Sequence, residues 1–341
     1  MSHYTATQTI DEMINENSWQ QLLTRNLLSM SLFFLYFFPS PPLTFIRHLS
    51  PKVTCLAHPT LCMVFAGCLT GELVTWDLRE TTATHHQLRE EEEEVVRTPT
   101  FTSRGPHTSR VTAVRHLQET GQGSEVPVYS EAGRLAAFQL VSVETQARLV
   151  VWTVLDSQRD FDTQLGLAHW GRVRMVPSSV IDLASLLASE PPSKEPEVHG
   201  HDLALDPEDS TRLYVGADAG MVIHGSTQAD HRPSPRLFKP EIETNASCNS
   251  IAFCPFGEPY MLLGSQDGSI RLHNSSNERP LITWAGTVDN EPILKVIWSS
   301  SRPCVFFILD TASRIHLWDL GAGDIYPAHT VQFGDKVLLV A

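Results

Sequence analysis

Two stretches of the chain repeat one pattern: CNSIAFCPFGEPYMLLGSQDGSIRLH (residues 248–273) and ILKVIWSSSRPCVFFILDTASRIHLWDL (residues 293–320). Each has an apolar run, a turn with a proline, a second apolar run, a turn near an aspartate, and a run that alternates polar and apolar residues. The alternating runs predict half-buried strands. Asp267-Gly268 predicts a two-residue hairpin turn with positive φ at both central residues.

The two copies end at His273 and at Trp318-Asp319, and His273 and Trp318 are 45 residues apart. Periods of about 40–45 residues with a terminal Trp-Asp are typical of WD-repeat propeller blades. We therefore predict an all-β fold, a WD-repeat β-propeller of four-stranded blades, over residues 44–341. Five blades are recognisable, near residues 52–78, 110–155, 201–224, 248–273 and 293–320.

Equivalent positions in these blades are expected to have structural roles. The residues predicted to close the blades are Trp76, Asp77, Trp152, His224, His273, Trp318 and Asp319. Those predicted to form the hairpin turns are Gly71, Asp218, Gly220, Asp267 and Gly268. Turn chemistry accounts for these aspartates, and for Asp310, better than catalysis does.

The segments between the repeats should supply the fourth strands and long insertions. Fourth strands are expected at residues 97–103, 171–176, 236–239 and 281–284. Among the insertions, Glu90–Glu94 is most simply a solvated loop, and Ser179–Ser189 (SVIDLASLLAS) predicts a short helix. Lys336–Val340 would open a sixth blade. We expect that blade to be incomplete because the chain stops within this apolar run.

Residues 1–43 do not belong to the repeat, and we expect them to be disordered or in part the product of an incorrect gene model, such as translated intron. Their apolar run, Leu27–Phe38, has twelve residues. As a helix it would cover about 18 Å, against roughly 30 Å of bilayer hydrocarbon. The sequence therefore predicts no membrane span.

Composition excludes several classes of function. The formal net charge of −14 argues against nucleic acid as a partner, because nucleic-acid binding needs clustered Lys and Arg. The six cysteines are scattered, which predicts mostly buried thiols without disulfides. His85-His86 and the pair His199 and His201 lack a third metal ligand at a usual spacing. No motif of an enzyme or a nucleotide site occurs, so we predict no catalysis, no metal and no cofactor.

Trp76-Asp77-Leu78-Arg79 matches the WDxR pattern of substrate receptors of cullin-4 ubiquitin ligases. Trp-Asp-Leu is also the ordinary end of a blade, so the motif is weak. It keeps a ligase receptor as the alternative function. A propeller hydrolase would need acids or histidines that converge at one mouth of the channel.

Residues 296–320 resemble the blade of dynein intermediate chains that reads W-S-P-x-x-P-x-x-F…D…L-W-D/N-L. Trp298, Pro303, Phe306 and Asp310 are among the matching residues, whereas Ser300 stands where the family has proline. Residues 253–273, GADAGMVIHGSTQ and RLFKPE are similar to the intermediate chains of cytoplasmic dynein 2, the motor of retrograde intraflagellar transport. The resemblance covers about residues 50–340.

This resemblance implies a non-catalytic motor subunit in the cytoplasm and cytoskeleton, at the cilium and the ciliary base. The implied partners are the dynein 2 heavy chain, a second intermediate chain, light chains and intraflagellar-transport particles. The family holds its light chains with an extended N-terminal region, which this short N-terminus does not match. Because the short hairpins leave little side chain for contacts, we expect the rim that they form to make few contacts with partners. Blades three to five, which match the family best, should dominate heavy-chain binding.

Overall fold

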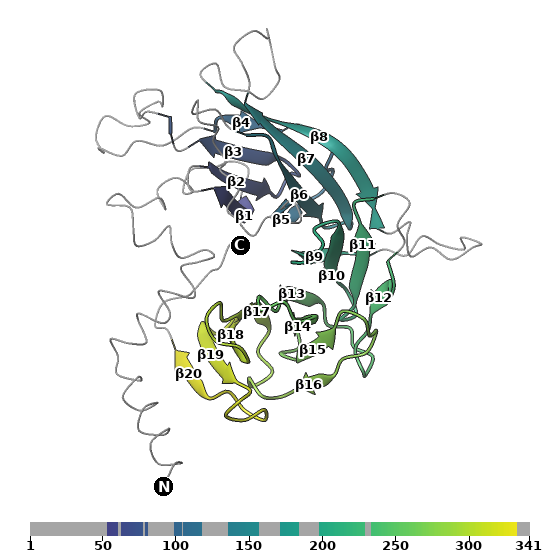
Figure 1. Ribbon diagram of the computed structural model, residues 1–341, viewed down its shortest axis with the longest axis vertical. Helices are drawn as coiled ribbons and strands as arrows, with labels where there is room; N and C mark the ends of the chain where they lie inside the picture. The colour runs from purple at the N-terminus through teal and green to yellow at the C-terminus, as the bar shows by residue number, and fades with distance from the viewer. Residues whose placement is uncertain are drawn as a thin grey trace, which may run out of the picture.

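The computed structural model describes residues 53–60, 63–77, 79–80, 99–103, 105–117, 136–156, 171–183, 198–228 and 233–332 of the 341-residue chain. Within these ranges the strands form five four-stranded antiparallel sheets, each made from strands that follow one another along the chain (Figure 1). The predicted all-β, WD-repeat propeller fold is confirmed.

Each blade is built from four consecutive strands. Blade 1 has β1 (Val53–Thr60), β2 (Met63–Cys68), β3 (Leu73–Asp77) and β4 (Phe101–Thr102). Blade 2 has β5 (Val111–Leu117), β6 (Phe138–Glu144), β7 (Arg148–Asp156) and β8 (Val173–Asp182). Blade 3 has β9 (Gly200–Leu205), β10 (Arg212–Ala217), β11 (Val222–Ser226) and β12 (Leu237–Phe238). Blade 4 has β13 (Cys248–Phe253), β14 (Tyr260–Ser265), β15 (Ile270–Asn274) and β16 (Ile282–Trp284). Blade 5 has β17 (Ile293–Trp298), β18 (Val305–Asp310), β19 (Arg314–Asp319) and β20 (His329–Gln332).

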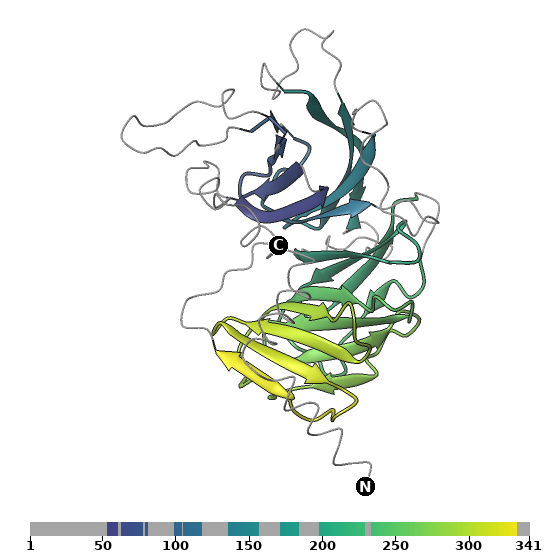
Figure 2. The ribbon, with the colours of Figure 1, turned by 60° about the vertical axis from the view of Figure 1, so that its left-hand side comes forward.

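The blades follow one another along an arc, with the first strand of each blade innermost and the fourth outermost (Figures 1 and 2). Apolar side chains fill the space between neighbouring sheets, as the period-2 pattern requires. Between blades 1 and 2, for example, Phe65 and Leu73 share a buried cluster with Leu140 and Trp152. Between blades 4 and 5, Leu272 and Trp284 share one with Phe306, Trp318 and their neighbours.

All five inner strands share one irregularity near their first residues. The register against the second strand shifts between Val53 and Cys55 in β1, and the same shift recurs in β5, β9, β13 and β17. An extra residue of this kind bends a strand and turns a side chain out of the alternating pattern. The shift therefore places polar side chains of the inner strands, such as Asn249, close to the neighbouring blade.

The hairpins between second and third strands differ from one blade to another. At Asp267-Gly268 the prediction of positive φ at both residues is wrong, because only Gly268 has it, at 78°. There Ser265 N bonds Ser269 O and Gly268 N bonds Ser265 O, which is a three-residue turn closed by a left-handed glycine. The predicted two-residue geometry occurs instead in blade 3, where Ala219 and Gly220 both have positive φ.

Other predictions also meet the structure. The helix predicted from Ser179 is wrong at its start, because Ser179–Asp182 pair with β7 as the end of β8. Strand β20, which was not predicted, completes blade 5. The residues of Leu27–Phe38, Glu90–Glu94 and Lys336–Val340 lie outside the described residues. Within the described ranges, no helix has the length and hydropathy needed to cross a membrane.

Gly268 and Gly257 allow a matched test of the hairpin geometry. Both have positive φ, 78° and 77°, but a Cβ on Gly268 would lie 2.8 Å from the backbone of Asn290, whereas a Cβ on Gly257 has nothing within 4 Å. We expect Gly257→Ala to lower the free energy of unfolding by about 1 kcal/mol, the cost of left-handed φ. Gly268→Ala should lower it by roughly 1–3 kcal/mol more, because the turn must move. Urea unfolding measures both, and equal losses would contradict this close approach.

Candidate functional site

A buried ion cluster lies where the inner strands meet. Asp202 on β9 accepts hydrogen bonds from Arg115 Nη2 of β5 at 2.7 Å and from Lys295 Nζ of β17 at 3.2 Å. Two backbone amides donate to the same carboxylate, Leu203 N at 2.9 Å and Ile251 N of β13 at 3.0 Å. One side chain therefore joins the inner strands of blades 2, 3, 4 and 5.

The charges of this cluster compensate one another. Burial alone would raise the pKa of Asp202, but Lys295, Arg115 and the two amide donors outweigh it and lower that pKa below its usual value. Burial lowers the pKa of Lys295 although Asp202 acts against this shift. Because the carboxylate has four donors, it is committed to holding the strands and is poorly suited to act as a catalytic base.

At the interface of blades 4 and 5, the neutral hydroxyl of Ser250 makes a link equivalent to that of Asp202. Ser250 stands in β13 where Asp202 stands in β9, since each pairs with a glycine of the second strand. Ser250 Oγ accepts a hydrogen bond from Val296 N of the following blade at 3.1 Å, as Asp202 does from Ile251 N. A polar side chain at this position thus pins each of these two inner strands to its successor.

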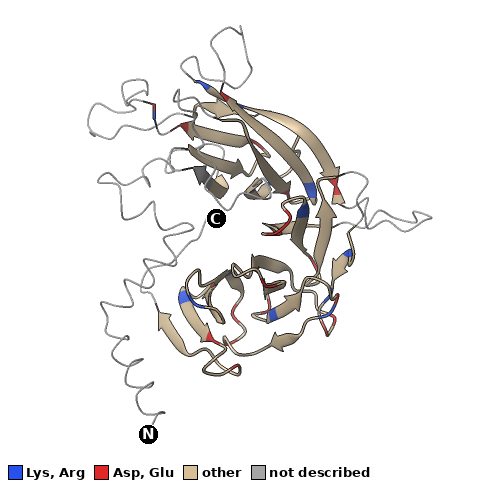
Figure 3. Cartoon of the chain, viewed as in Figure 1, with Lys and Arg blue, Asp and Glu red and all other residues tan. Residues whose placement is uncertain are grey.

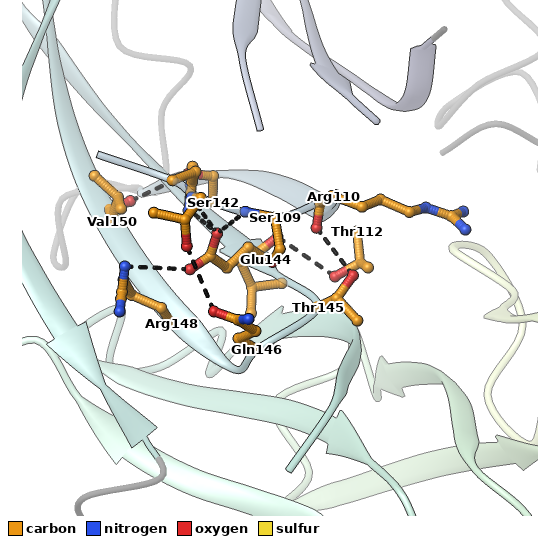
Figure 4. A network of polar contacts seen from close by, with 12 residues as sticks. Ser109, Arg110, Thr112, Ser142, Glu144, Thr145, Gln146, Arg148 and Val150 are labelled. Carbon is orange, nitrogen blue, oxygen red and sulfur yellow. Dashed lines mark hydrogen bonds and ion pairs between the residues drawn. The ribbon is translucent and has the colours of Figure 1, made fainter. Parts of the chain in front are cut away.

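A second network surrounds Glu144 at the end of β6 (Figure 4). Its Oε2 accepts hydrogen bonds from Thr108 N and Ser109 N, both at 2.7 Å, and Arg148 Nη1 lies 3.6 Å from Oε1. The buried carboxylate therefore holds the segment that leads from blade 1 into β5. Charge-assisted bonds to two adjacent amides are among the stronger ways to fix a loop.

His107 extends this network into the core. Its Nε2 lies 2.6 Å from Ser142 Oγ, and Trp152 Nε1 donates to the same hydroxyl at 2.7 Å. Burial lowers the pKa of His107 to about 4, against the opposing effect of Glu144. The ring is therefore neutral at physiological pH. It joins the blade-closing Trp152 to the loop before its own blade.

Blade 5 has an acid at the position of Glu144 but gives it other partners. Asp310 Oδ2 accepts a hydrogen bond from Arg314 Nε at 2.7 Å and lies 3.1 Å from His316 Nε2. Arg314 also donates to Val288 O and to Asp289, in the loop from blade 4. Ile308 replaces Ser142, so the buried Nε1 of Trp318 has no hydrogen-bond partner.

The predicted blade-closing residues lie on the third strands, and all of them are buried except Asp319, which is partly exposed. Their contacts differ. His224 stacks on Tyr214 with ring centroids 4.2 Å apart, and Trp318 stacks on Phe306 at 5.7 Å. Burial, and then the charge of Arg271, lower the pKa of His273 to about 3. These residues support the blades and do not converge on one site.

The predicted turn residues lie in interlocked turns. Asp218 lies 2.7 Å from the ring nitrogens of both His199 and His201. These hydrogen bonds lower the pKa of Asp218, although burial acts in the opposite direction. Asp267 accepts hydrogen bonds from Ser269, and Gly71 packs against the backbone of the segment before β5. Side chains and backbone of these turns are thus used for internal contacts.

The acid of the WDxR motif is also used internally. Asp77 accepts hydrogen bonds from Arg79 Nε at 2.8 and 3.1 Å, so the guanidinium lies against the blade end. Figure 3 shows that charged residues are sparse along the sheets and gather at strand ends and turns. Among the described residues, no group of three His, Cys, Asp or Glu is arranged to hold a metal ion. His85-His86 lie outside those residues.

Sequence reasoning missed Asp202, Arg115, Lys295, Glu144 and His107. The available signal was charge within apolar strands, together with the recurring acid and arginine four residues apart at Glu144 and Arg148 and at Asp310 and Arg314. The arrangement as a whole holds blades and loops in place. Its hydrogen bonds and ion pairs fix the inner strands and the loops between blades relative to one another.

Curated proteins from mouse and human that are named cytoplasmic dynein 2 intermediate chain 1 match this chain. The mouse protein is 35% identical over 299 residues, which cover 81% of this chain. The human protein is 33% identical over 307 residues, which cover 84%. The chain is a homologue of cytoplasmic dynein 2 intermediate chain 1. The resemblance inferred from the repeats and loops is confirmed.

The chain spans less than a third of these relatives, 29% of the mouse protein and 28% of the human one. No known protein-family profile matches it. Among solved structures, Sqt1 of Chaetomium thermophilum, bound to the N-terminus of the ribosomal protein L10, aligns with a TM-score of 0.49 and 17% identity. That alignment covers 83% of this chain and 62% of the other, and the fold assignment rests on the five sheets instead.

Removing the charge of the Asp202 carboxylate should destabilise the propeller. Asp202→Asn leaves Arg115 and Lys295 buried without a counter-charge, and we expect a loss of about 3–5 kcal/mol in the free energy of unfolding. Asp209→Asn is the control, because the side chains of its ion pair with Arg212 are 39% and 43% exposed and Asn can still accept the hydrogen bonds from Thr211; it should cost less than about 1 kcal/mol. Urea titration compares the two. Equal effects would show that the cluster around Asp202 adds no more to the free energy of unfolding than the Asp209 pair does.

Two buried histidines should make stability fall in acid. The pKa values of His107 and His273 are lowered to about 4 and about 3 in the fold, against about 6.5 in the unfolded chain. The unfolded state therefore binds more protons over this range, and stability present above pH 6.5 is lost as pH falls toward 4. We expect His273→Phe to flatten that slope, measured by urea unfolding from pH 7 to 4.5. An unchanged slope would contradict titration of His273.

Proposed function

We propose that this chain is a non-catalytic intermediate-chain subunit of cytoplasmic dynein 2. In this proposal the propeller binds the dynein heavy chain and serves retrograde intraflagellar transport and cilium assembly. The observation that carries it is the match of 35% identity over 299 residues to an intermediate chain of that motor. The match covers most of the propeller, so what it supports first is a role for the propeller.

The polar networks support the same role. Asp202 and Glu144 spend their hydrogen-bonding capacity on strands and loops of the chain itself. Rigid blades hold the outer loops in fixed positions, which suits a protein that offers surfaces to partners. The further partners we propose are the second intermediate chain, the light chains and the intraflagellar-transport particles. The proposed locations are the cytoplasm, the cytoskeleton, the cilium and the ciliary base.

The alternative is a substrate receptor of a cullin-4 ligase, which rests on the WDxR motif. A receptor would need the side chain of Arg79 to face a ligase adaptor. Arg79 instead binds Asp77 through its guanidinium and through its backbone N at 3.0 Å. This internal use favours the motor subunit over the receptor.

Affinity purification of the tagged chain from ciliated cells tests the proposal. We expect mass spectrometry to find the dynein 2 heavy chain enriched, and to lose it when Cys248–Leu320 is deleted. Deletion of Glu90–Glu94 is the control and should leave the heavy chain bound. Enrichment of a cullin-4 adaptor without the heavy chain, and its loss in Arg79→Ala, would favour the receptor and overturn the motor assignment.

A further inference from the structure

The inner strands of the arc carry more positive than negative charge. Strands β1, β5, β9, β13 and β17 contain three residues that are charged at neutral pH, which are Arg115, Lys295 and Asp202. Two cations therefore share one carboxylate, and one positive charge on these strands has no acid of its own. The chain as a whole has the opposite balance, with a net charge of −14. Its overall composition thus does not explain the positive inner side.

Holding the strands together does not require two cations. One ion pair would balance the charge of Asp202, and two backbone amides already donate to the same carboxylate. The second cation has a cost instead. Burial lowers the pKa of Lys295, and the charge of Arg115 lowers it further, against the opposing effect of Asp202. Two cations that share a single counter-charge in a partly buried place are stabilised by a further anion.

Both cations keep part of their surface in contact with solvent. The side chains of Arg115 and Lys295 are 24% and 14% exposed, whereas that of Asp202 is 5% exposed. Lys295 on β17 reaches Asp202 on β9 past β13, which lies between these two strands, so its side chain runs along the inner side of the arc (Figure 1). An anion can therefore approach the two cations from the inner side, while the carboxylate stays covered.

The two side chains have hydrogen-bond donors to spare. An arginine has five N–H groups and a lysine has three. Arg115 donates to Val114 O at 2.9 Å and to Asp202 Oδ1 at 2.7 Å, and Lys295 donates to Asp202 Oδ2 at 3.2 Å. Within the described residues these are their only side-chain hydrogen bonds. The remaining donors lie on either side of one carboxylate, a spacing that an anion with two or more oxygens can bridge.

Other acids near the inner strands are used elsewhere. Within the described residues, Asp202 is the only acid at ion-pair distance from either cation. Strands β1 and β13 contain no acid. Asp218 is bonded to His199 and His201. An anion next to the two cations would therefore meet no second carboxylate on the inner strands.

We propose that Arg115 and Lys295 form a binding site for an anionic oxygen group, a phosphate or a carboxylate, on the inner side of the arc. The anion accepts hydrogen bonds from the remaining N–H groups of both side chains and balances the second positive charge. It does not displace Asp202, whose oxygens stay bonded to the strands. This inference goes beyond the proposed function and does not depend on the heavy chain.

Titration of the purified full chain with inorganic phosphate, and separately with acetate, tests the proposal. At an ionic strength held constant with sodium chloride, we expect saturable binding, tighter for phosphate because it carries more charge. NMR amide shifts give the Kd. Lys295→Met should weaken it at least fivefold, and this variant leaves Arg115 and Asp202 as a neutral pair. Lys239→Met is the matched control, because Lys239 is exposed, and it should change the Kd less than twofold.

A second variant and the wild-type spectrum make the test independent of the folding of Lys295→Met. Arg115→Gln leaves Lys295 with Asp202, again a neutral pair, and should weaken the Kd at least fivefold. In the wild-type chain, the amides of residues 113–117 and 293–297 should be among those that phosphate shifts. The site is overturned by a wild-type chain that binds neither anion saturably, by shifts confined to other residues, or by a folded variant of Arg115 or Lys295 that binds within twofold of wild type.

Discussion

The carboxylate of Asp202 joins the inner strands of blades 2, 3, 4 and 5 and so constrains how these four blades are placed. A buried acid is costly unless its charge is compensated, and here Arg115, Lys295 and two amides provide the compensation. These donors come from different blades. The electrostatic need of one side chain therefore becomes a constraint on how four sheets are placed. A hydrophobic contact could not do this, because it has little directionality.

Equivalent positions in different blades make the same connection with different residues. Glu144 and Asp310 occupy equivalent positions, and each holds the loop that enters its own blade, but Glu144 binds backbone amides and Asp310 works through Arg314. Ser142 accepts a hydrogen bond from Trp152 Nε1. At the equivalent position Ile308 cannot accept one from Trp318, which stacks on Phe306 instead. The repeat therefore preserves the position of a connection and not its chemistry.

The surface at the hairpin turns differs from the outer rim between blades 4 and 5 in which side chains are bonded within the chain. The hairpin turns are joined to the segments between blades through Asp218, which lies 2.7 Å from His199 Nδ1, and through Asp267, which accepts a hydrogen bond from Thr244 Oγ1 at 3.2 Å. At the outer rim between blades 4 and 5, the loop ends are satisfied by Asp319 while Ile325 and Tyr326 remain exposed.

The sequence by itself determined the class of fold. The 45-residue period, the alternating runs and the blade ends at Trp76, Trp152 and Trp318 are local patterns, and local patterns report which residues face the core of a sheet. It also carried the resemblance to dynein intermediate chains, which needs no coordinates. It could not give the turn type at Gly268, because a loop of two or three residues fits the same letters. The sequence also predicted a helix over Ser179–Ser189, but its first residues, Ser179–Asp182, pair with β7, and this pairing overrides the local preference. Only the tertiary structure decided that Asp202 meets Arg115 and Lys295 and that Trp284 reaches Asp324. These partners are far apart in sequence, and their meeting depends on the register and packing of whole sheets, which no short stretch of sequence specifies.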